Sequence, residues 1–451
     1  MTLATVSQYD SAAVSTRTDR AIVLGASMAG LCAARVLMDG FGEVTVIERD
    51  SLPDEPVVRQ SVPQGSQPHI LWEAGRSTLE DLFPGYSDEL LAAGGVLIDG
   101  RSDFRNYSRG AFLAPGMDDF SLYSATRPLY EHLVRRRVSN LNDIEIRDNC
   151  QFIDYLVDDT SNTIEGVSIR TRGGKREELT AELVVDATGR TSRTPVWLEK
   201  HGYRSPALDE LCINVAYSTT FVERPAGDHR TIGILAEAPR TRGGLAAPVE
   251  GGRWLMNLHG VHGDHPPTDT GGFVDFAASL PTPEIKQLLE EYQLVDGDIS
   301  HYPFSANRRY RYEDLDRFPN GLLVVGDAIA SFNPIYGQGM SVAALESLEL
   351  HHTLVKGARE GIAPRFFNRA GTIVDTAWMM ATGADFSYPE TDGTKPRGTT
   401  FFNWYLARLF RNAHTDGRLT DAFNRVLSMQ QPPTSLLHPT VLWRVFKPIR
   451  G

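Results

Sequence analysis

The first residues that could do chemistry are Gly25-Ala26-Ser27-Met28-Ala29-Gly30, a short stretch between two glycines. Gly25 would allow a tight turn, and Gly30 would let a helix pack closely on a sheet. The free amides and positive dipole at the start of such a helix can bind a pyrophosphate. Ser27 replaces the usual middle glycine, so its side chain must turn away from the phosphates.

An acidic residue follows at the distance that dinucleotide sites require. Glu48 lies 23 positions after Gly25, at the expected end of a second strand. A carboxylate there accepts hydrogen bonds from a ribose diol and favours an adenosine without a 2′-phosphate. The residues that this pattern predicts to bind a dinucleotide are Gly25, Ser27, Met28, Ala29, Gly30, Glu48 and Arg49.

Two further turns combine a strand end, an aspartate and small residues. In the first, Asp186 is followed by Gly189 and Arg190, a pattern equally typical of a simple strand-ending turn. In the second, Gly326-Asp327 ends an apolar run, and its carboxylate could hold ribityl or ribose hydroxyls. The 333–340 loop then opens a helix, whose first amides can stabilise negative charge on a polar ring edge.

In this order, the three motifs resemble those of the FAD-dependent monooxygenases of the aromatic-hydroxylase (group A) type, across residues 20–360. The resemblance implies non-covalent FAD, with Arg127 as the FAD-contacting arginine of a helix, ahead of Arg135 and Arg136. Backbone groups along the flavin ring would come from Pro334, Gly337, Gln338 and Gly339. The further FAD residues that the resemblance implies are Arg59, Arg127, Asp186, Gly189, Arg190, Gly326, Asp327, Gly339 and Met340.

The segment from Arg59 to Trp72 is most similar to the bacterial olefin (polyether-type) epoxidase branch of that family. In that branch the arginine lies near the FAD phosphates and the loop lies close to the flavin. Ser61 and Gln67 depart from the pattern, which usually has glycine and histidine there. The Trp-x-Trp-x-Ile-Pro motif of the flavin halogenases is absent, which disfavours halogenation.

The implied activity is that of a monooxygenase acting on a hydrophobic small molecule, isoprenoid or polyketide-like. NAD(P)H would reduce FAD as a transient visitor, and an oxygen atom of O2 would reach the substrate through a flavin C4a-hydroperoxide. A phenol would need a base, for which the sequence offers no clear candidate, and an alkene would need none, which modestly favours epoxidation over hydroxylation. A geranylgeranyl reductase-like double-bond reductase and a flavin-binding protein without turnover remain alternatives.

The elements that must position these residues predict an α/β fold. We expect a Rossmann-type FAD-binding domain, an inserted antiparallel β-sheet substrate domain and a helical C-terminal cap. Glycine pairs predict hairpin turns at 173–174, 243–244 and 251–252. The expected domains are a flexible tail 1–19, the FAD domain 20–88, 120–200 and 305–364, the substrate domain 89–119 and 201–304, and the helical region 365–451.

The composition is that of an ordinary globular enzyme. The chain has 451 residues, of which 41% are hydrophobic and 23% charged, and its formal net charge is −12. An acidic balance disfavours nucleic acid and anionic membrane as main partners. The three cysteines have no metal-type spacing and predict reduced, buried thiols in a cytoplasmic protein. The oligomeric state is left open.

Two groups of residues favour a structural role over a chemical one. His259, His262, Asp264 and His265 crowd into a Gly/Pro-rich stretch that predicts a solvated hairpin loop, and no metal site is expected. The apolar stripe at 402, 405, 406 and 409 has helical spacing and predicts core. A lid, a dimer surface or peripheral contact with a membrane is the alternative for this stripe.

Overall fold

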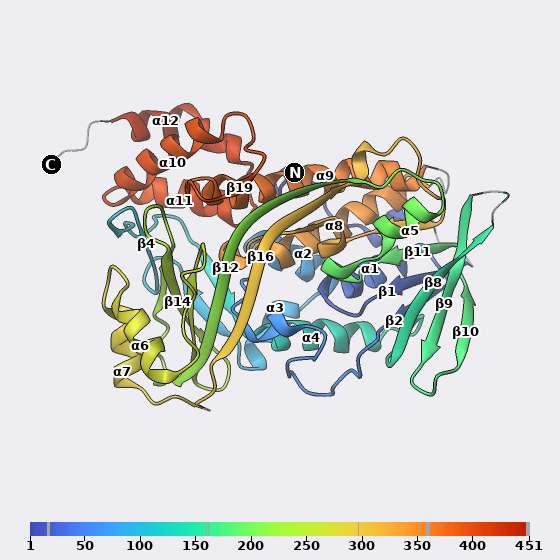
Figure 1. Ribbon diagram of the computed structural model, residues 1–451, viewed down its shortest axis with the longest axis horizontal. Helices are drawn as coiled ribbons and strands as arrows, with labels where there is room; N and C mark the ends of the chain where they lie inside the picture. Colours follow the sequence, from blue (N-terminus) through green and yellow to red (C-terminus); the bar gives the residue numbers. More distant parts are fainter. Residues whose placement is uncertain (16–18, 159, 161, 296, 358–360, 448–451) are drawn as a thin grey trace.

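The glycine turn follows the central strand of a parallel sheet (Figure 1). The computed structural model describes residues 1–15, 19–158, 160, 162–295, 297–357 and 361–447. The strand order is β17-β11-β1-β2-β7, and the carboxyl ends of these parallel strands lie along one edge, where ligands bind in such sheets. The strands are β1 (Arg20–Leu24), β2 (Glu43–Ile47), β7 (Ile144–Arg147), β11 (Leu183–Asp186) and β17 (Leu322–Val324).

Helices cover this sheet, which is why its strands read as continuous apolar runs. Helix α1 packs against α4 and α8, and α8 packs against α2 and α9. Helical composition at 28–38, near 72–82 and at 127–138 predicts a helix in each range, and all three are confirmed. The helices are α1 (Met28–Leu37), α2 (Glu73–Leu82), α3 (Tyr86–Ala92), α4 (Arg127–Ser139), α5 (Thr194–Lys200), α8 (Gly339–Val355) and α9 (Ile362–Asp385).

A small antiparallel sheet lies at the end of the molecule opposite the C-terminal helices (Figure 1). Strands β9 and β10 form the hairpin predicted at 173–174, which is confirmed. Two further strands, β3 (Val96–Asp99) and β6 (Ser121–Ser124), pair with each other. The strands of the small sheet are β8 (Cys150–Asp158), β9 (Thr163–Thr171) and β10 (Arg176–Thr180).

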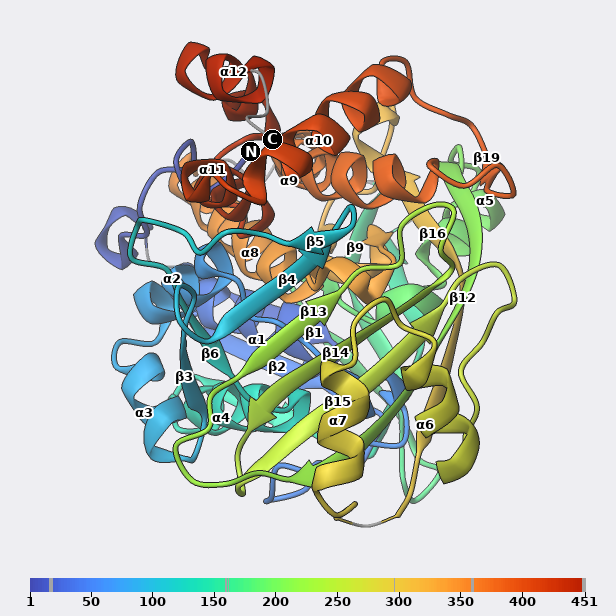
Figure 2. The same cartoon turned by 90° about the vertical axis from the view of Figure 1, so that its left-hand side faces the viewer.

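A large sheet faces the parallel domain, and its order is β18-β16-β12-β15-β14-β13-β4-β5, with β19 paired to β12. Helices α6 and α7 cover its outer face (Figure 2). Strands β4 and β13 run parallel, so the sheet is mixed, whereas the sequence predicts an antiparallel one. The elements are β4 (Phe104–Ser108), β5 (Ala111–Phe112), β12 (Ala207–Glu223), β13 (Thr231–Ile234), β14 (Arg242–Val249), β15 (Arg253–Gly260), β16 (Ser300–Arg311), β18 (Ala330–Ser331), β19 (Asp392–Gly393), α6 (Thr270–Ala278) and α7 (Glu284–Glu291).

Two glycine-based expectations have different outcomes in this sheet. The turn at 251–252 joins β14 to β15 and is confirmed. The turn expected at 243–244 is wrong, because both glycines lie inside β14. Strand β16 also runs through the expected domain boundary at residue 305 and ends at Arg311.

The C-terminal helices lie over one end of the large sheet (Figure 1). They are α10 (Thr399–Ala413), α11 (Gly417–Leu427) and α12 (Pro439–Phe446). Tyr405 and Leu409 are completely buried, and Phe402 and Leu406 pack against the same cluster, so the stripe is core as predicted. No helix within the described residues is both long and apolar enough to cross a membrane.

The described part of the N-terminal tail is packed against the protein, unlike the flexible tail that the sequence predicts. The amide of Leu3 donates to Met429 O at 3.0 Å, and Thr2 is fully buried. The ring of Tyr9 lies 4.6 Å from that of His351. These contacts involve residues far apart in the sequence, so local composition did not show them.

Cys212 also differs from expectation, because it is exposed while the other two cysteines are buried.

Candidate active site

The turn after β1 has a shape that glycine alone fits. Gly25 has a φ of +106°, and a Cβ there would lie 2.6 Å from Ala187 O. A Cβ at Gly30 would collide with the carbonyl of Gly25, so α1 starts in close contact with the turn. The side chain of Ser27 does not cap α1, which leaves the first amides of the helix available to an anion.

Glu48 lies beside this turn and is buried. Its Oε2 accepts from Ala26 N at 2.9 Å and is 3.0 Å from Arg59 Nη1, and its Oε1 accepts from Asp50 N at 3.0 Å. The carboxylate therefore fixes the turn, while its remaining lone pairs are those that a ribose diol could use. Arg49 is exposed and makes a long contact of 3.5 Å with Ser61 O.

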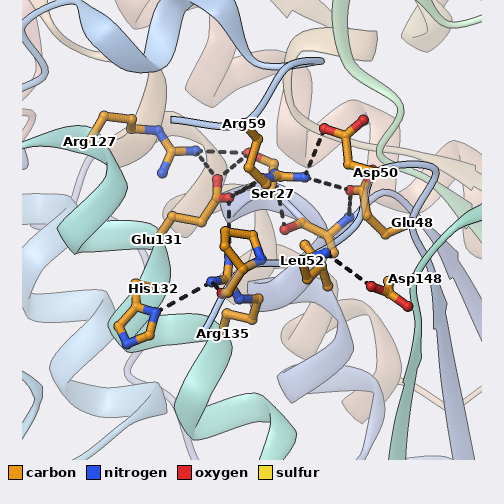
Figure 3. Close-up of polar contacts among 12 residues, drawn as sticks. Ser27, Glu48, Asp50, Leu52, Arg59, Arg127, Glu131, His132, Arg135 and Asp148 are labelled. Carbon is orange, nitrogen blue, oxygen red and sulfur yellow. Dashed lines mark hydrogen bonds and ion pairs between the residues drawn. The ribbon is translucent and has the colours of Figure 1, made fainter. Parts of the chain in front are cut away.

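A charged network joins this turn to α4 (Figure 3). Ser27 Oγ donates to Glu131 Oε2 and accepts from Arg127 Nη2, both at 2.8 Å. The carboxylate of Glu131 also lies 2.7 Å from Arg59 Nη2. Arg127 Nη1 is buried without a hydrogen-bond partner among the described residues. This spare donor beside the glycine turn is what a bound pyrophosphate would satisfy.

Glu131 is the member of this network that the sequence analysis missed. Burial favours its neutral form, but the charges of Arg127 and Arg59 outweigh burial and lower its pKa. The signal was the spacing from Arg127, because residues i and i+4 share one face of a helix. Arg135, the less favoured FAD arginine, lies farther from Glu131 than Arg127 does, with its Nη1 3.8 Å from Glu131 Oε1.

The Asp186 turn holds itself together. Asp186 Oδ1 accepts from Thr188 N at 2.9 Å, and Oδ2 accepts from the hydroxyls of Ser192 and Thr194, both at 2.6 Å. The carboxylate of Asp186 thus accepts hydrogen bonds from residues of its own loop, and its contact with FAD stays a prediction. Arg190 extends from the same turn to Ala306 O, at 2.7 Å.

The second aspartate turn follows β17 at the carboxyl edge of the parallel sheet. Asp327 is exposed, and the charges of Arg190 and Arg127 act on its carboxylate. Gly326, with a φ of +66°, brings this turn against Ala29, since a Cβ there would lie 2.6 Å from Ala29 Cβ. The first and third motifs therefore meet in space.

Beneath this turn lies Glu346, a buried carboxyl group of α8. Its Oε2 accepts from Gly326 N at 2.6 Å, and its Oε1 has no hydrogen-bond partner among the described residues. Burial raises its pKa to about 8, so the acid is protonated at neutral pH. A neutral side chain supports the turn without adding negative charge next to Asp327.

The 333–340 loop is held from two sides. Trp72 Nε1 donates to Tyr336 O at 2.9 Å, and a Cβ at Gly337, whose φ is +62°, would lie 3.0 Å from Ile70 Cβ. The loop from Arg59 to Trp72 and the 333–340 loop are therefore in contact. On the other side, Asn333 Nδ2 donates to the buried carboxylate of Asp385 at 3.0 Å.

The end of this loop opens toward empty space. Helix α8 begins at Gly339, two residues before the start expected from the sequence, and no heavy atom lies within 4 Å of a Cβ built there. The Gln338 side chain turns toward α11 and donates to Leu427 O at 3.1 Å. The first amides of α8 thus face an open site, as a polar ring edge requires. Met340 is buried beneath them.

An apolar cavity lies between the 333–340 loop and the inner face of the large sheet; we call it the inner cavity. The loop contributes Pro334 to Gly337, and α11 closes one side with Phe423 and Leu427. The polar side chains in its lining include Gln67, Asn106, Tyr217, Asn257, His259 and Tyr336. A mostly apolar pocket with a few polar groups is the usual form of a small-molecule site.

The four residues of the histidine-rich segment point to different partners. Asp264 pairs with Arg242 at 2.7 Å, His265 Nε2 lies 3.1 Å from Asn214 O, and His262 contacts Thr391. The prediction of a solvated loop is wrong for His259, which is buried in β15 and faces the inner cavity. No group of three His, Cys, Asp or Glu side chains in the described part of the chain is arranged to hold a metal ion.

No family model matches the chain. The chain is 34% identical over 436 residues to Protein Rv3254 of Mycobacterium tuberculosis (strain ATCC 25618 / H37Rv), covering 91% of this chain and 90% of the relative. The chain belongs to the same family as Protein Rv3254. It is also 24% identical over 348 residues to kynurenine 3-monooxygenase of Dictyostelium discoideum, covering 73% and 68% of the two chains.

Solved structures share the fold. The flavin-dependent brominase Bmp2 matches with a TM-score of 0.66 and 15% identity, over 94% of this chain and 98% of that chain. pqsL, a probable FAD-dependent monooxygenase from Pseudomonas aeruginosa, matches with a TM-score of 0.59 and 17% identity, over 82% and 98%. The expected α/β fold, with its Rossmann sheet, β-sheet domain and helical C-terminal region, is confirmed. The chain has the fold of flavin-dependent monooxygenases.

The residues of this site fit FAD. The glycine turn, the unpartnered Arg127 Nη1 and the free first turn of α1 suit the pyrophosphate. Asp327 is exposed within reach of the charges of Arg190 and Arg127, and the open space at Gly339 leaves room for the flavin ring. The position of each FAD contact on this chain stays a prediction.

Proposed function

We propose that the protein is a flavin-dependent monooxygenase that uses NAD(P)H and O2 to hydroxylate or epoxidise a hydrophobic small molecule, isoprenoid or polyketide-like, in the inner cavity. The observation that carries the proposal is the wall shared by two sites. Pro334 to Gly337 line the inner cavity, and the same loop continues into the open site before Gly339. A ring bound at Gly339 would therefore lie next to a molecule in the cavity.

Each part of the chain has a definite task in this proposal. Gly25, Gly30 and Arg127 would hold the pyrophosphate, Glu48 the ribose, and Asp327 the ribityl chain. FAD, when bound, accepts a hydride from NAD(P)H and activates O2 for transfer of one oxygen atom. The chain itself binds the substrate, orients it and excludes water.

Exclusion of water follows from how the cavity is closed. The Trp72–Tyr336 hydrogen bond fixes one wall, and Phe423 and Leu427 of α11 supply another. Apolar walls protect a reactive oxygen species from water and strengthen the few polar contacts inside. The C-terminal helices thus act as a cap on the reaction site.

The alternatives differ in what they need from the structure. A double-bond reductase would need a proton donor over the alkene. Of the two tyrosines in the cavity lining, Tyr217 already donates its hydroxyl to Asn333 Oδ1 at 2.5 Å, so Tyr336 is the one left for that task. The similarity of the Arg59–Trp72 loop to the olefin-epoxidase branch supports oxygen transfer. The likeness to the brominase concerns the fold alone, and the halogenase motif is absent from the sequence.

The test uses purified protein loaded with FAD. We expect a yellow protein with releasable FAD, NAD(P)H oxidation that a substrate stimulates, and one O2 consumed for each NAD(P)H. Saturation of a prenyl chain in the absence of O2 would instead identify a reductase. FAD binding with no NAD(P)H oxidation across a panel of phenols and alkenes would identify a protein without turnover.

A further inference from the structure

The outward face of the C-terminal helices carries large aromatic side chains that the proposed function does not use. Phe401 and Trp404 of α10 are 61% and 50% exposed. Trp443 and Phe446 of α12 are 62% and 48% exposed. We call these four residues the aromatic patch. They lie outside the buried stripe of α10, and large apolar side chains that gather on a surface usually mark an interaction site.

The aromatic patch is one surface held in a fixed place. The ring centroid of Trp404 lies 5.8 Å from that of Phe401 and 6.1 Å from that of Phe446. Trp443 lies three positions before Phe446 and so shares a face of α12 with it. Val445, between them, is completely buried and docks α12 on the helices below. Both views show α12 at the edge of the molecule (Figure 1 and Figure 2).

Positively charged side chains surround this patch. Arg408 Cζ lies 5.4 Å from the centroid of the Phe446 ring, and Lys447 Nζ lies 5.4 Å from that of the Trp443 ring. Arg411 is exposed and lies three positions after Arg408, on the same face of α10. These three cations have no ion pair among the residues that the structure describes. Their charge is therefore available to an anionic partner.

The charge of this region is opposite to that of the whole chain. Residues 399–447 contain five Arg and one Lys against two Asp, whereas the formal net charge of the protein is −12. The acidic balance that disfavoured an anionic membrane in the sequence analysis is therefore an average over the chain, and it does not describe this face. A basic face on an acidic protein is attracted to anionic surfaces and turns toward them.

The combination of residues favours a lipid bilayer over a second copy of the chain. Tryptophan rings flanked by Arg and Lys are typical of protein segments that lie at the boundary between lipid headgroups and acyl chains. Each Lys or Arg near an anionic lipid surface adds to the attraction. A twofold axis through the patch would instead bring Arg411 and Lys447 close to the same cations of the other copy, which repel them.

We propose that the aromatic patch docks the protein on the surface of an anionic lipid bilayer, with Trp404, Trp443 and Phe446 among the headgroups. Docking itself does not depend on the proposed function. Its use rests on that function, because α11 packs against α12 and also closes the inner cavity with Phe423 and Leu427. Docking would place this cap against the bilayer, where a hydrophobic substrate accumulates.

The test measures binding of the full chain to vesicles, without turnover. Purified protein is mixed with vesicles of phosphatidylcholine alone, or of phosphatidylcholine and phosphatidylglycerol in equal parts, and the bound fraction is determined by flotation. We expect binding to the anionic vesicles, a blue shift of tryptophan fluorescence on binding, and weaker binding at high salt. The neutral vesicles should bind much less protein.

Two double variants separate the contributions of charge and of the rings. Arg411→Gln with Lys447→Gln should weaken binding about 25-fold, since each cation near an anionic surface contributes about fivefold in affinity. Trp404→Ser with Trp443→Ser should weaken binding about tenfold or more and reduce the blue shift, because the apolar area that enters the bilayer is lost. All four side chains lie on the surface, so both variants should fold normally.

A matched control tests whether the position of the charges matters. Arg172→Gln with Lys175→Gln removes two exposed cations from the β9–β10 turn, at the opposite end of the molecule, and should bind like the wild type. Binding to neither kind of vesicle, equal binding to both, or wild-type binding by either patch variant would overturn the proposal. A dimer in analytical ultracentrifugation that the tryptophan variant dissociates would overturn it too, and would assign the patch to a second copy. Failure of the proposed function would show differently, as absence of FAD binding or of NAD(P)H-dependent O2 uptake.

Discussion

Arg127 Nη2 donates to Ser27 Oγ at 2.8 Å, although one residue opens α4 and the other ends the β1 turn. This bond explains how the turn tolerates a serine where a glycine is usual. The hydroxyl points to Arg127 and Glu131, away from the first amides of α1, as the sequence analysis required of it. The bond also brings the predicted FAD arginine to the pyrophosphate end of the site.

Gly339→Val should remove flavin binding with little effect on folding. Gly339 has no positive φ, and a Cβ there meets no atom within 4 Å, so the new side chain would fill the space for the ring. We expect FAD affinity to fall about tenfold or more, with a change in unfolding free energy below about 0.5 kcal/mol. FAD fluorescence quenching and thermal denaturation measure the two effects.

The control for this variant is Gly173→Val. Gly173 also has open space around it but lies in the β9–β10 turn, far from the groove. It should bind FAD like the wild type. Equal affinity in both variants would show that the ring does not approach Gly339.

Glu131→Gln should destabilise the FAD-free protein more than the FAD-bound protein. The change removes the carboxylate that Arg127 and Arg59 share, so Arg127 loses its buried anion while Arg59 keeps Glu48, and breaking such a pair costs about 3 kcal/mol. Bound pyrophosphate would neutralise the same arginines, so FAD should raise the melting temperature more in the variant than in the wild type. The same destabilisation with and without FAD would place the pyrophosphate elsewhere.

Glu346→Gln should stabilise the protein at alkaline pH. The folded protein keeps this acid protonated up to about pH 8, while the unfolded chain ionises it near its ordinary value of 4.5. The unfolded state thus binds fewer protons in between, and this group makes stability fall as pH rises. At pH 8 we expect the variant to be more stable by about 2–4 kcal/mol, and at pH 4.5 to equal the wild type. Urea denaturation at both pH values checks this, and a constant difference would contradict it.

The tautomer of His259 can be observed directly. Protein with ¹⁵N-labelled histidine should show Nε2 without a hydrogen and Nδ1 with one, and the pattern should persist at pH 5 because burial lowers the pKa to about 3. Asn257→Leu removes the acceptor at Nδ1 and should alter the pattern. A hydrogen on Nε2 and none on Nδ1 in the wild type would contradict a hydrogen bond from His259 Nδ1 to Asn257 Oδ1.

The sequence predicted those parts of the fold and site that depend on local pattern. The glycine turn with Glu48 and the Gly326-Asp327 turn follow strands of the parallel sheet directly, so their positions along one edge of that sheet came from the order of elements. Helix α4 was predicted from its composition. The contact of the Arg59–Trp72 loop with the 333–340 loop was expected only through the family resemblance.

The rest depended on contacts between distant segments. His259 lies in a segment rich in glycine and proline, and only the pairing of β15 with β12 and β14 shows that it is a buried strand residue. Gly243 looked like a turn residue because its partner ring is 16 positions away in the chain. The role of Glu131 was not predicted because it depends on contacts with Arg59 and Ser27, which lie in other segments of the chain.

The central claim is that the chain transfers an oxygen atom from O2 to its substrate, and labelling with ¹⁸O2 tests it most directly. FAD-loaded protein is given NAD(P)H, ¹⁸O2 and a phenol or alkene that stimulates NAD(P)H oxidation, and the product is analysed by mass spectrometry. The account predicts one ¹⁸O atom in the product for each NAD(P)H oxidised. A product that carries no label, or a substrate reduced under anaerobic conditions, would contradict it.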